Sequence, residues 1–136
     1  DAAPPLALDN EPDDINSDSV QLYLRMPGDR PHGWLIRPTG AGMIVSRSAS
    51  QFSDDVQPEG AWARTPAGYR ITVGVPVPHI QTLRAGERLG FDLIVNEMPP
   101  ERVRRAGQLV WSGGPGWAYL RGDRHDSAQF GELELR

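Results

Sequence analysis

The stretch Arg88–Glu97 alternates apolar and polar side chains, and this pattern limits what the chain can fold into more than any other. A repeat of two residues is typical of a β-strand that buries one face, because successive side chains of a strand point to opposite sides. Apolar Ile94 is the one exception on the polar side. We therefore predict a strand that ends at Asn96 and Glu97, shortly before a Pro-Pro pair that prevents further pairing. Its predicted buried face consists of Leu89, Phe91, Leu93 and Val95.

The same alternation recurs elsewhere in the chain. Ser19–Arg25 places Val20, Leu22 and Leu24 on one side. Tyr69–Val75 places its odd-numbered residues inward, and shorter strand candidates lie at 34–37, 43–45, 60–65, 108–112 and 130–135. With 15 Gly and 13 Pro, the chain is also rich in turn-forming residues. We predict an all-β fold, an antiparallel β-sandwich of the immunoglobulin-like or jelly-roll type with eight or nine strands and no long helix.

The domain organisation follows from composition. A chain of 136 residues is long enough for one domain with its own core. Residues 1–17 are acidic and proline-rich, so we assign them to a linker or loop and residues 18–136 to the sandwich.

Composition also excludes several kinds of function. The absence of cysteine rules out disulfides, thiolate metal sites and cysteine nucleophiles. A net charge of −4 argues against a nucleic-acid partner, and no run of about 18 apolar residues predicts a membrane span. The histidines, His32, His79 and His125, have no metal-type spacing, and no pair of acids stands out as an acid and base. We therefore predict that the chain is not an enzyme.

Five motifs, taken in order, resemble the family 9 carbohydrate-binding modules, which are β-sandwiches related to DOMON domains. The motifs are Asp18–Leu22, Gly68–Pro76, Gly90–Glu97, Trp111 and Phe130-Gly131, so the resemblance covers roughly residues 18–135. It implies non-catalytic binding of a polysaccharide or oligosaccharide by an accessory module of a larger secreted bacterial protein, in an extracellular or periplasmic location. The family's first strands have no counterpart in residues 1–17, so we expect a preceding domain or a partner chain to complete the sandwich. The alternative is a structural sandwich that docks on a catalytic domain or partner chain and has lost sugar binding.

The resemblance also implies where a sugar would bind. Family members clamp a sugar ring between two aromatic faces and hold its hydroxyl groups with polar side chains. Trp117, after the sequence Gly-Gly-Pro-Gly, matches the downstream aromatic, whereas no aromatic residue occurs in Asp9–Ser17 to match the upstream one. An anchor that packs on the sandwich is the alternative for Trp117. The predicted polar contacts are Asn96, Glu97, Arg121 and Arg124.

The remaining tryptophans and the acidic segment have simpler interpretations. Trp111 shares a strand with Leu109, and we predict it in the core, with Trp34 and Trp62 in the core or at a sheet edge. Related modules often hold structural calcium, and four acids near the start offer oxygen ligands of the kind that calcium prefers. These are Asp9, Asp13, Asp14 and Asp18. The segment lacks the EF-hand pattern, so a solvated acidic linker is the alternative, and no other cofactor is expected.

Overall fold

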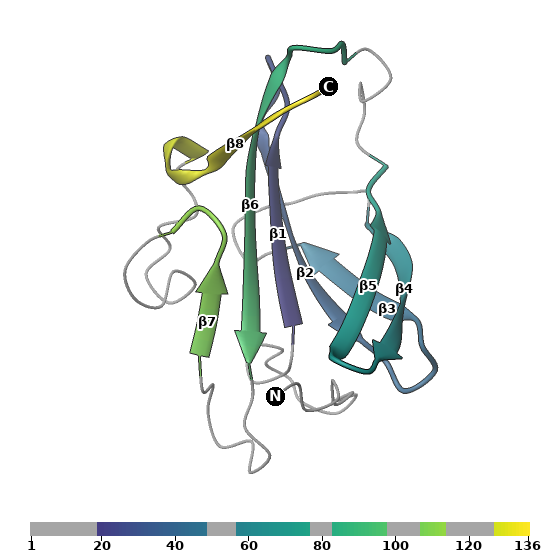
Figure 1. Ribbon diagram of the computed structural model, residues 1–136. Helices are drawn as coiled ribbons and strands as arrows, with labels where there is room; N and C mark the ends of the chain where they lie inside the picture. Colours follow the sequence, from purple (N-terminus) through teal and green to yellow (C-terminus); the bar gives the residue numbers. More distant parts are fainter. Residues whose placement is uncertain (1–18, 49–56, 77–82, 98–106, 114–126) are drawn as a thin grey trace.

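The computed structural model describes residues 19–48, 57–76, 83–97, 107–113 and 127–136 (Figure 1). Eight strands and one 3₁₀ turn make up the regular structure of these residues: β1 Ser19–Arg25, β2 Pro31–Pro38, β3 Ile44–Ser48, β4 Glu59–Thr65, β5 Gly68–Gly74, β6 Arg88–Glu97, β7 Gly107–Val110, η5 Ser127–Gln129 and β8 Gly131–Glu134. All strand pairs are antiparallel and fall into two sheets, which confirms the predicted β-sandwich. The linker assigned to residues 1–17 lies outside the described residues. Within the described ranges, no helix has the length and apolar character needed to cross a bilayer.

Strand β6 organises the large sheet, whose order is β3-β2-β1-β6-β7 with β8 also on β6. On one side β6 pairs with β1 from Ser19↔Asn96 to Arg25↔Gly90. On its other side β6 pairs with two strands in succession, because β7 occupies its last four residues and β8 its first four. The long alternating segment of the sequence is thus the one strand that three others share (Figure 1).

The small sheet is the hairpin of β4 and β5, and it joins the large sheet at the β3 edge. Met43 and Ala61 form a bridge there, and the Trp62 backbone N–H donates to the Gly42 carbonyl at 2.8 Å. The Trp62 indole N–H donates to the Thr39 carbonyl at 2.6 Å. Trp62 therefore packs at a sheet edge, as predicted, and it fixes the corner at which the chain passes from one sheet to the other.

The face of the large sheet that points toward β5 carries the main apolar core. Its buried members are Leu22, Met26, Trp34 and Ile36. Trp34 is 1% exposed, which confirms its predicted core position. Residues of β5, including Val73, pack against this cluster from the second sheet. The alternation in Ser19–Arg25 and in Tyr69–Val75 therefore predicted the inward sides correctly.

Burial along β6 differs from the sequence prediction. Asp92 and Ile94 are fully buried and Asn96 is 1% exposed, whereas Phe91, Leu93 and Val95 are only partly buried. The apolar set faces the main core, as predicted, since Phe91 and Leu93 pack against it, but its members other than Leu89 are less buried than Asp92, Ile94 and Asn96. The reason is that the outer face of β6 also packs on a cluster, formed with Tyr23 and Phe130, while β4 and β5 cover only part of the inner face.

Trp111 is the second correction. Its ring is 49% exposed, so the prediction of a core position is wrong. The ring contacts the edge of Phe91, with centroids 5.0 Å apart, and lies over Gly131. Trp111 shares the inner side of the sheet with Leu93, and among the described residues no strand of the second sheet covers that side at this position.

Candidate functional site

The outer face of the large sheet carries a row of polar side chains that strand register brings together. Asn96 lies opposite Ser19 on β1 and opposite Gln108 on β7, so all three side chains share this face. Two residues further along, Gln21 lies opposite Ile94, and Tyr23 lies opposite Asp92. So many buried amide and hydroxyl groups on one face of a sheet are unusual, because each buried polar atom needs a hydrogen-bond partner.

Hydrogen bonds link the first row into a chain of amides. The Gln108 Nε2 group donates to Asn96 Oδ1 at 2.7 Å, and Asn96 Nδ2 donates to Ser19 Oγ at 2.8 Å. The buried Gln108 Oε1 atom has no hydrogen-bond partner among the described residues. The row thus ends on β7 in an unused acceptor.

A second amide has an unused group of the opposite kind. Tyr23 donates its hydroxyl hydrogen to Gln21 Oε1 at 2.7 Å. The buried Gln21 Nε2 atom finds no acceptor within the part of the chain that the structure describes. A buried amide atom without a hydrogen-bond partner lowers the stability of the fold by about 1–3 kcal/mol. Gln21 Nε2 and Gln108 Oε1 therefore favour the binding of a ligand or water that both donates and accepts hydrogen bonds.

Asp92 has a different task. Its carboxylate is fully buried and accepts three hydrogen bonds. Two come from Ser112, from the backbone N–H at 3.1 Å and from the hydroxyl at 2.8 Å, and the third comes from the Leu93 backbone N–H at 2.9 Å. Ser112 follows β7 at the point where β8 has not yet begun. Asp92 therefore holds the chain to β6 across the gap between two edge strands, and it acts as a structural group.

Asn96 and Glu97, the predicted polar pair, lie in contrasting settings. The Asn96 amide is buried and engaged on both sides by Ser19 and Gln108. Glu97 is exposed at the end of β6, and its carboxylate lies beside Gly107 on β7. Asn96 and Gln108 thus lie together on the outer face at one end of the β6–β7 pair. Glu97, the next residue of β6, lies at the same end on the inner side of the sheet, with Gly107, and faces solvent.

Known structures identify this arrangement of strands. No protein-family model matches the sequence, and no curated protein matches it. A solved structure of a family 9 carbohydrate-binding module from Caldicellulosiruptor kristjanssonii, in complex with glucose, superposes with a TM-score of 0.68 at 20% sequence identity. The chain has a CBM9-like fold. The match covers 98% of this chain and 66% of the solved one.

The other predicted site residues are an aromatic residue, two arginines and four acids. Trp117, Arg121 and Arg124 lie outside the described residues, as do the predicted calcium ligands Asp9, Asp13, Asp14 and Asp18. Within the described ranges, no group of three or more His, Asp or Glu side chains is placed to hold a metal ion.

Sequence reasoning missed the roles of Gln21, Gln108, Asp92 and Ser112 on the polar face. A signal for Gln21 was present, because it stands in the motif Asp18–Leu22 where the CBM9 family usually has an acid. Gln108 lies in β7 and Ser112 follows that strand. Only the register of Gln108 with Asn96 and the hydrogen bonds of Ser112 to Asp92 reveal that both residues share the side of Asp92.

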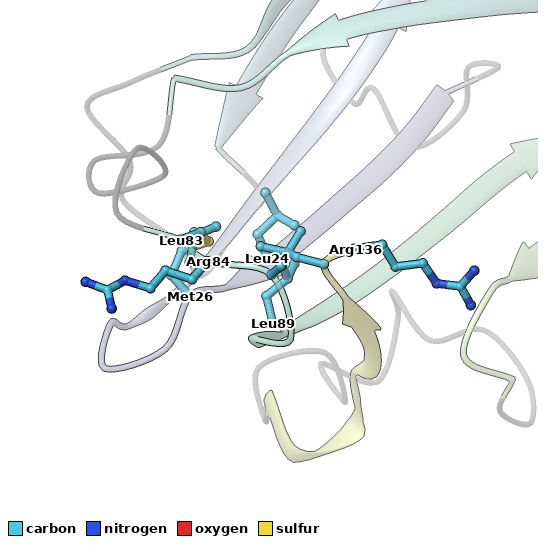
Figure 2. Close-up of a pocket in the computed structure, with 8 residues that line it drawn as sticks. Leu24, Met26, Leu83, Arg84, Leu89 and Arg136 are labelled. Carbon is cyan, nitrogen blue, oxygen red and sulfur yellow. The ribbon is translucent and has the colours of Figure 1, made fainter.

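A cavity of about 370 Å³ lies near the first residues of β6, at the other end of this strand from Asn96 (Figure 2). Its wall is mostly apolar and does not suit a polar ligand. Leu24, Met26, Leu83 and Leu89 form much of its wall. Figure 2 shows the side chains of two lining arginines extending away from these residues in opposite directions. No polar groups converge there, and sugar recognition needs convergent donors and acceptors.

Near this end, Asp29 is the residue with a perturbed carboxyl group. Its carboxylate lies 3.2 Å from His32 Nε2 and accepts the Arg30 backbone N–H at 2.7 Å. These hydrogen bonds, the one from His32 first, lower the pKa of Asp29 below its ordinary value of 3.8. The His32 ring stacks on Trp34 with centroids 5.7 Å apart, so the pair anchors the turn after β1 to the core.

Proposed function

We propose that this chain is a non-catalytic carbohydrate-binding module. The observation that carries the proposal is the amide row of Ser19, Asn96 and Gln108, which ends in an acceptor, Gln108 Oε1, that has no partner among the described residues. The exposed Glu97 carboxylate lies at the same end of β6, on the other side of the sheet. Sugar hydroxyl groups donate and accept at once, and planar amides and carboxylates are the side chains that best replace their water. The glucose bound by a solved module of the same fold supports this ligand class.

In this proposal the polar end of β6 and β7 supplies directional hydrogen bonds and Trp117 supplies a stacking face. Trp117 follows Ser112 closely in sequence, and Ser112 is held against β6 by Asp92. An aromatic ring packs on the axial C–H groups of a pyranose, while Glu97 and an arginine, Arg121 or Arg124, bind its hydroxyls. The finer parts of the proposal are an accessory role in a larger secreted bacterial protein and structural calcium at the acids Asp9, Asp13, Asp14 and Asp18.

The test is calorimetric titration of the folded chain with a panel of mono- and oligosaccharides, glucose and its β-linked oligomers included. We expect Trp117→Ala to abolish binding and Gln108→Ala to weaken it about fivefold, because one hydrogen bond is worth about 1 kcal/mol. Trp111→Ala is the matched control, since Trp111 lies on the other side of the sheet, and it should bind sugar as the parent chain does.

Two results would contradict the proposal. A folded chain that binds no sugar of the panel would remove the function. Unfolding of the Trp117→Ala variant, seen by circular dichroism, would reassign Trp117 to a packing role and remove it from the site. A sandwich that has lost sugar binding and serves only to dock on a partner, the alternative function, is not favoured by these observations.

A further inference from the structure

The inner side of the large sheet bears an apolar area that the described strands of the second sheet cover only in part. We call it the uncovered face and define it by Phe91, Leu93, Val95, Leu109, Trp111 and Leu133. Register places them together, since Leu109 lies opposite Val95, Leu133 lies opposite Leu89, and the Trp111 N–H donates to the Leu93 carbonyl at 2.9 Å. Leu109 is 72% exposed and Trp111 49%, which is costly for large apolar side chains.

The position of the small sheet explains why this face is open. β4 turns over from the β3 edge, and β5 follows it toward the middle of the large sheet (Figure 1). Neighbouring strands are about 4.8 Å apart in any sheet, so two strands cannot span a sheet that extends from β3 to β7. A cleft of about 530 Å³ remains between the sheets, lined by side chains of β5 and of the large sheet that are all apolar apart from the Tyr69 hydroxyl.

The backbone of β5 faces this cleft with an edge suited to another strand. Antiparallel pairs alternate between hydrogen-bonded and non-hydrogen-bonded types. The Trp62 N–H points away from β5, to Gly42, so the pair Trp62↔Ile71 is of the second type, and Gly60↔Val73 is as well. The N–H and C=O groups of Ile71 and Val73 therefore point away from β4, toward a position where the described residues place no strand.

We propose that the cleft beside β5 receives a β-strand from another polypeptide segment, which pairs with the β5 edge and packs alternate apolar side chains on the uncovered face. Exposed strand edges are ready templates for such addition, and pockets for every second side chain provide the specificity. The proposal does not depend on sugar binding, since Asn96 and Gln108 lie on the opposite side of the sheet.

The cleft also defines the chemistry of the occupant. Its floor extends from Val20 to Leu24, about 13 Å at 3.3 Å per residue, and continues at Leu24 into the cavity of Figure 2. A strand of about five to seven residues fits this length, with Val, Ile, Leu or Phe at every second position. Exposed Arg70 lies on the outer side of β5, so an acidic residue on the outer side of the new strand is favoured.

The probe is a synthetic nine-residue peptide with valine at alternate positions, separated by threonine and glutamate, titrated into the whole 136-residue chain. We expect binding that protects the Ile71 and Val73 amides from hydrogen exchange, measured by NMR. A peptide of the same composition with its valines consecutive is the matched control, and it should bind at least tenfold more weakly.

Two variants separate edge pairing from apolar contact. Val73→Pro removes a donor on the free edge and spares the bonds to β4, so it should weaken binding at least tenfold in a chain that stays folded. If that variant fails to fold, Leu109→Thr serves instead, because Leu109 is mostly exposed, and it should weaken binding several-fold.

Three outcomes would overturn the proposal. Equal binding of the two peptides would reveal an unspecific apolar surface. Protection of the Ile71 and Val73 amides in the monomeric chain alone would mean that its own residues fill the cleft. A dimer in sedimentation analysis that competes with the peptide would assign the face to a second copy of the chain.

Discussion

The two faces of the large sheet differ in a way that reverses the usual relation between polarity and burial. The outer face carries Ser19, Gln21, Asp92 and Asn96, and all four are at most 2% exposed. The inner face of β6 carries Phe91, Leu93 and Val95, which are only partly buried. Burial therefore does not follow polarity along these strands, and the buried polar face is stable because hydrogen bonds satisfy most of its groups.

The two faces stabilise the sheet in different ways, the outer face by buried hydrogen bonds and the inner face by apolar packing. On the outer face, removal of one group leaves other buried groups without partners, so each polar residue matters strongly. On the inner face, side chains contribute in proportion to the apolar area that they bury, and near β7 this area is small. The predictions below test this difference.

Adjacent residues on the two faces give the largest effect. Ile94 is fully buried on the outer face and Leu93 is partly buried on the inner face. We expect Ile94→Ala to lower the free energy of unfolding by about 4 kcal/mol and Leu93→Ala by about 2 kcal/mol, measured by urea denaturation. Equal losses would contradict the assignment of the better-packed face.

Asp92 tests the polar network of the outer face. Asp92→Ala leaves the Ser112 and Leu93 backbone N–H groups without their acceptor, so we expect a loss of about 3 kcal/mol in unfolding free energy. Ser112→Ala, the control, removes only the hydroxyl bond and should cost about 1 kcal/mol. A loss at Asp92 as small as that at Ser112 would mean that the carboxylate does not connect β6 to the residues after β7.

Gly131 tests the open side of the inner face. A Cβ atom at this position would overlap the Trp111 ring, and the ring is free to shift because half of it is exposed. We expect Gly131→Ala to cost only about 1 kcal/mol and to shift tryptophan fluorescence to the red. Gly40→Ala, where a Cβ meets no atom within 4 Å, should leave the spectrum unchanged. A large loss of stability would show that Trp111 is fixed.

Asp29 gives the smallest effect, at the rim of the inner face. Its pKa is lowered by the His32 hydrogen bond, so its contribution to stability is present above pH 3.8 and is lost as the pH falls through the lowered folded pKa. Melting temperatures from about pH 5 to about pH 2 should show a small advantage over Asp29→Asn that disappears at the acidic end. A constant advantage would contradict the role of the carboxylate.

The sequence predicted the class of fold well. Alternation of apolar and polar residues in Ser19–Arg25, Tyr69–Val75 and Arg88–Glu97 located three strands, because successive side chains of a strand point to opposite faces. Which face of Arg88–Glu97 is more deeply buried was not predictable, since this depends on how many strands the second sheet contains. The misplacement of Trp111 has the same cause.

The candidate site was less predictable than the fold. Asn96 and Glu97 were predicted from their place at the end of an alternating strand, and their role in binding stays a prediction. Gln108 and Gln21 were missed because their importance arises from register across three strands, which no local pattern encodes. Trp117, Arg121 and Arg124 stay predictions, because they lie outside the described residues.

Two strands, β7 and β8, share one side of β6, and this arrangement bears on how the connection between them can change. β7 and β8 attach to β6 independently, each by its own register, and Trp117, Arg121 and Arg124 all fall in the sequence between them. The two ends of this connection are thus fixed by bonds that do not involve it. A change in its length or composition therefore leaves both registers intact. Under the proposed function, such a change would alter which sugar is bound while the sheet stays the same.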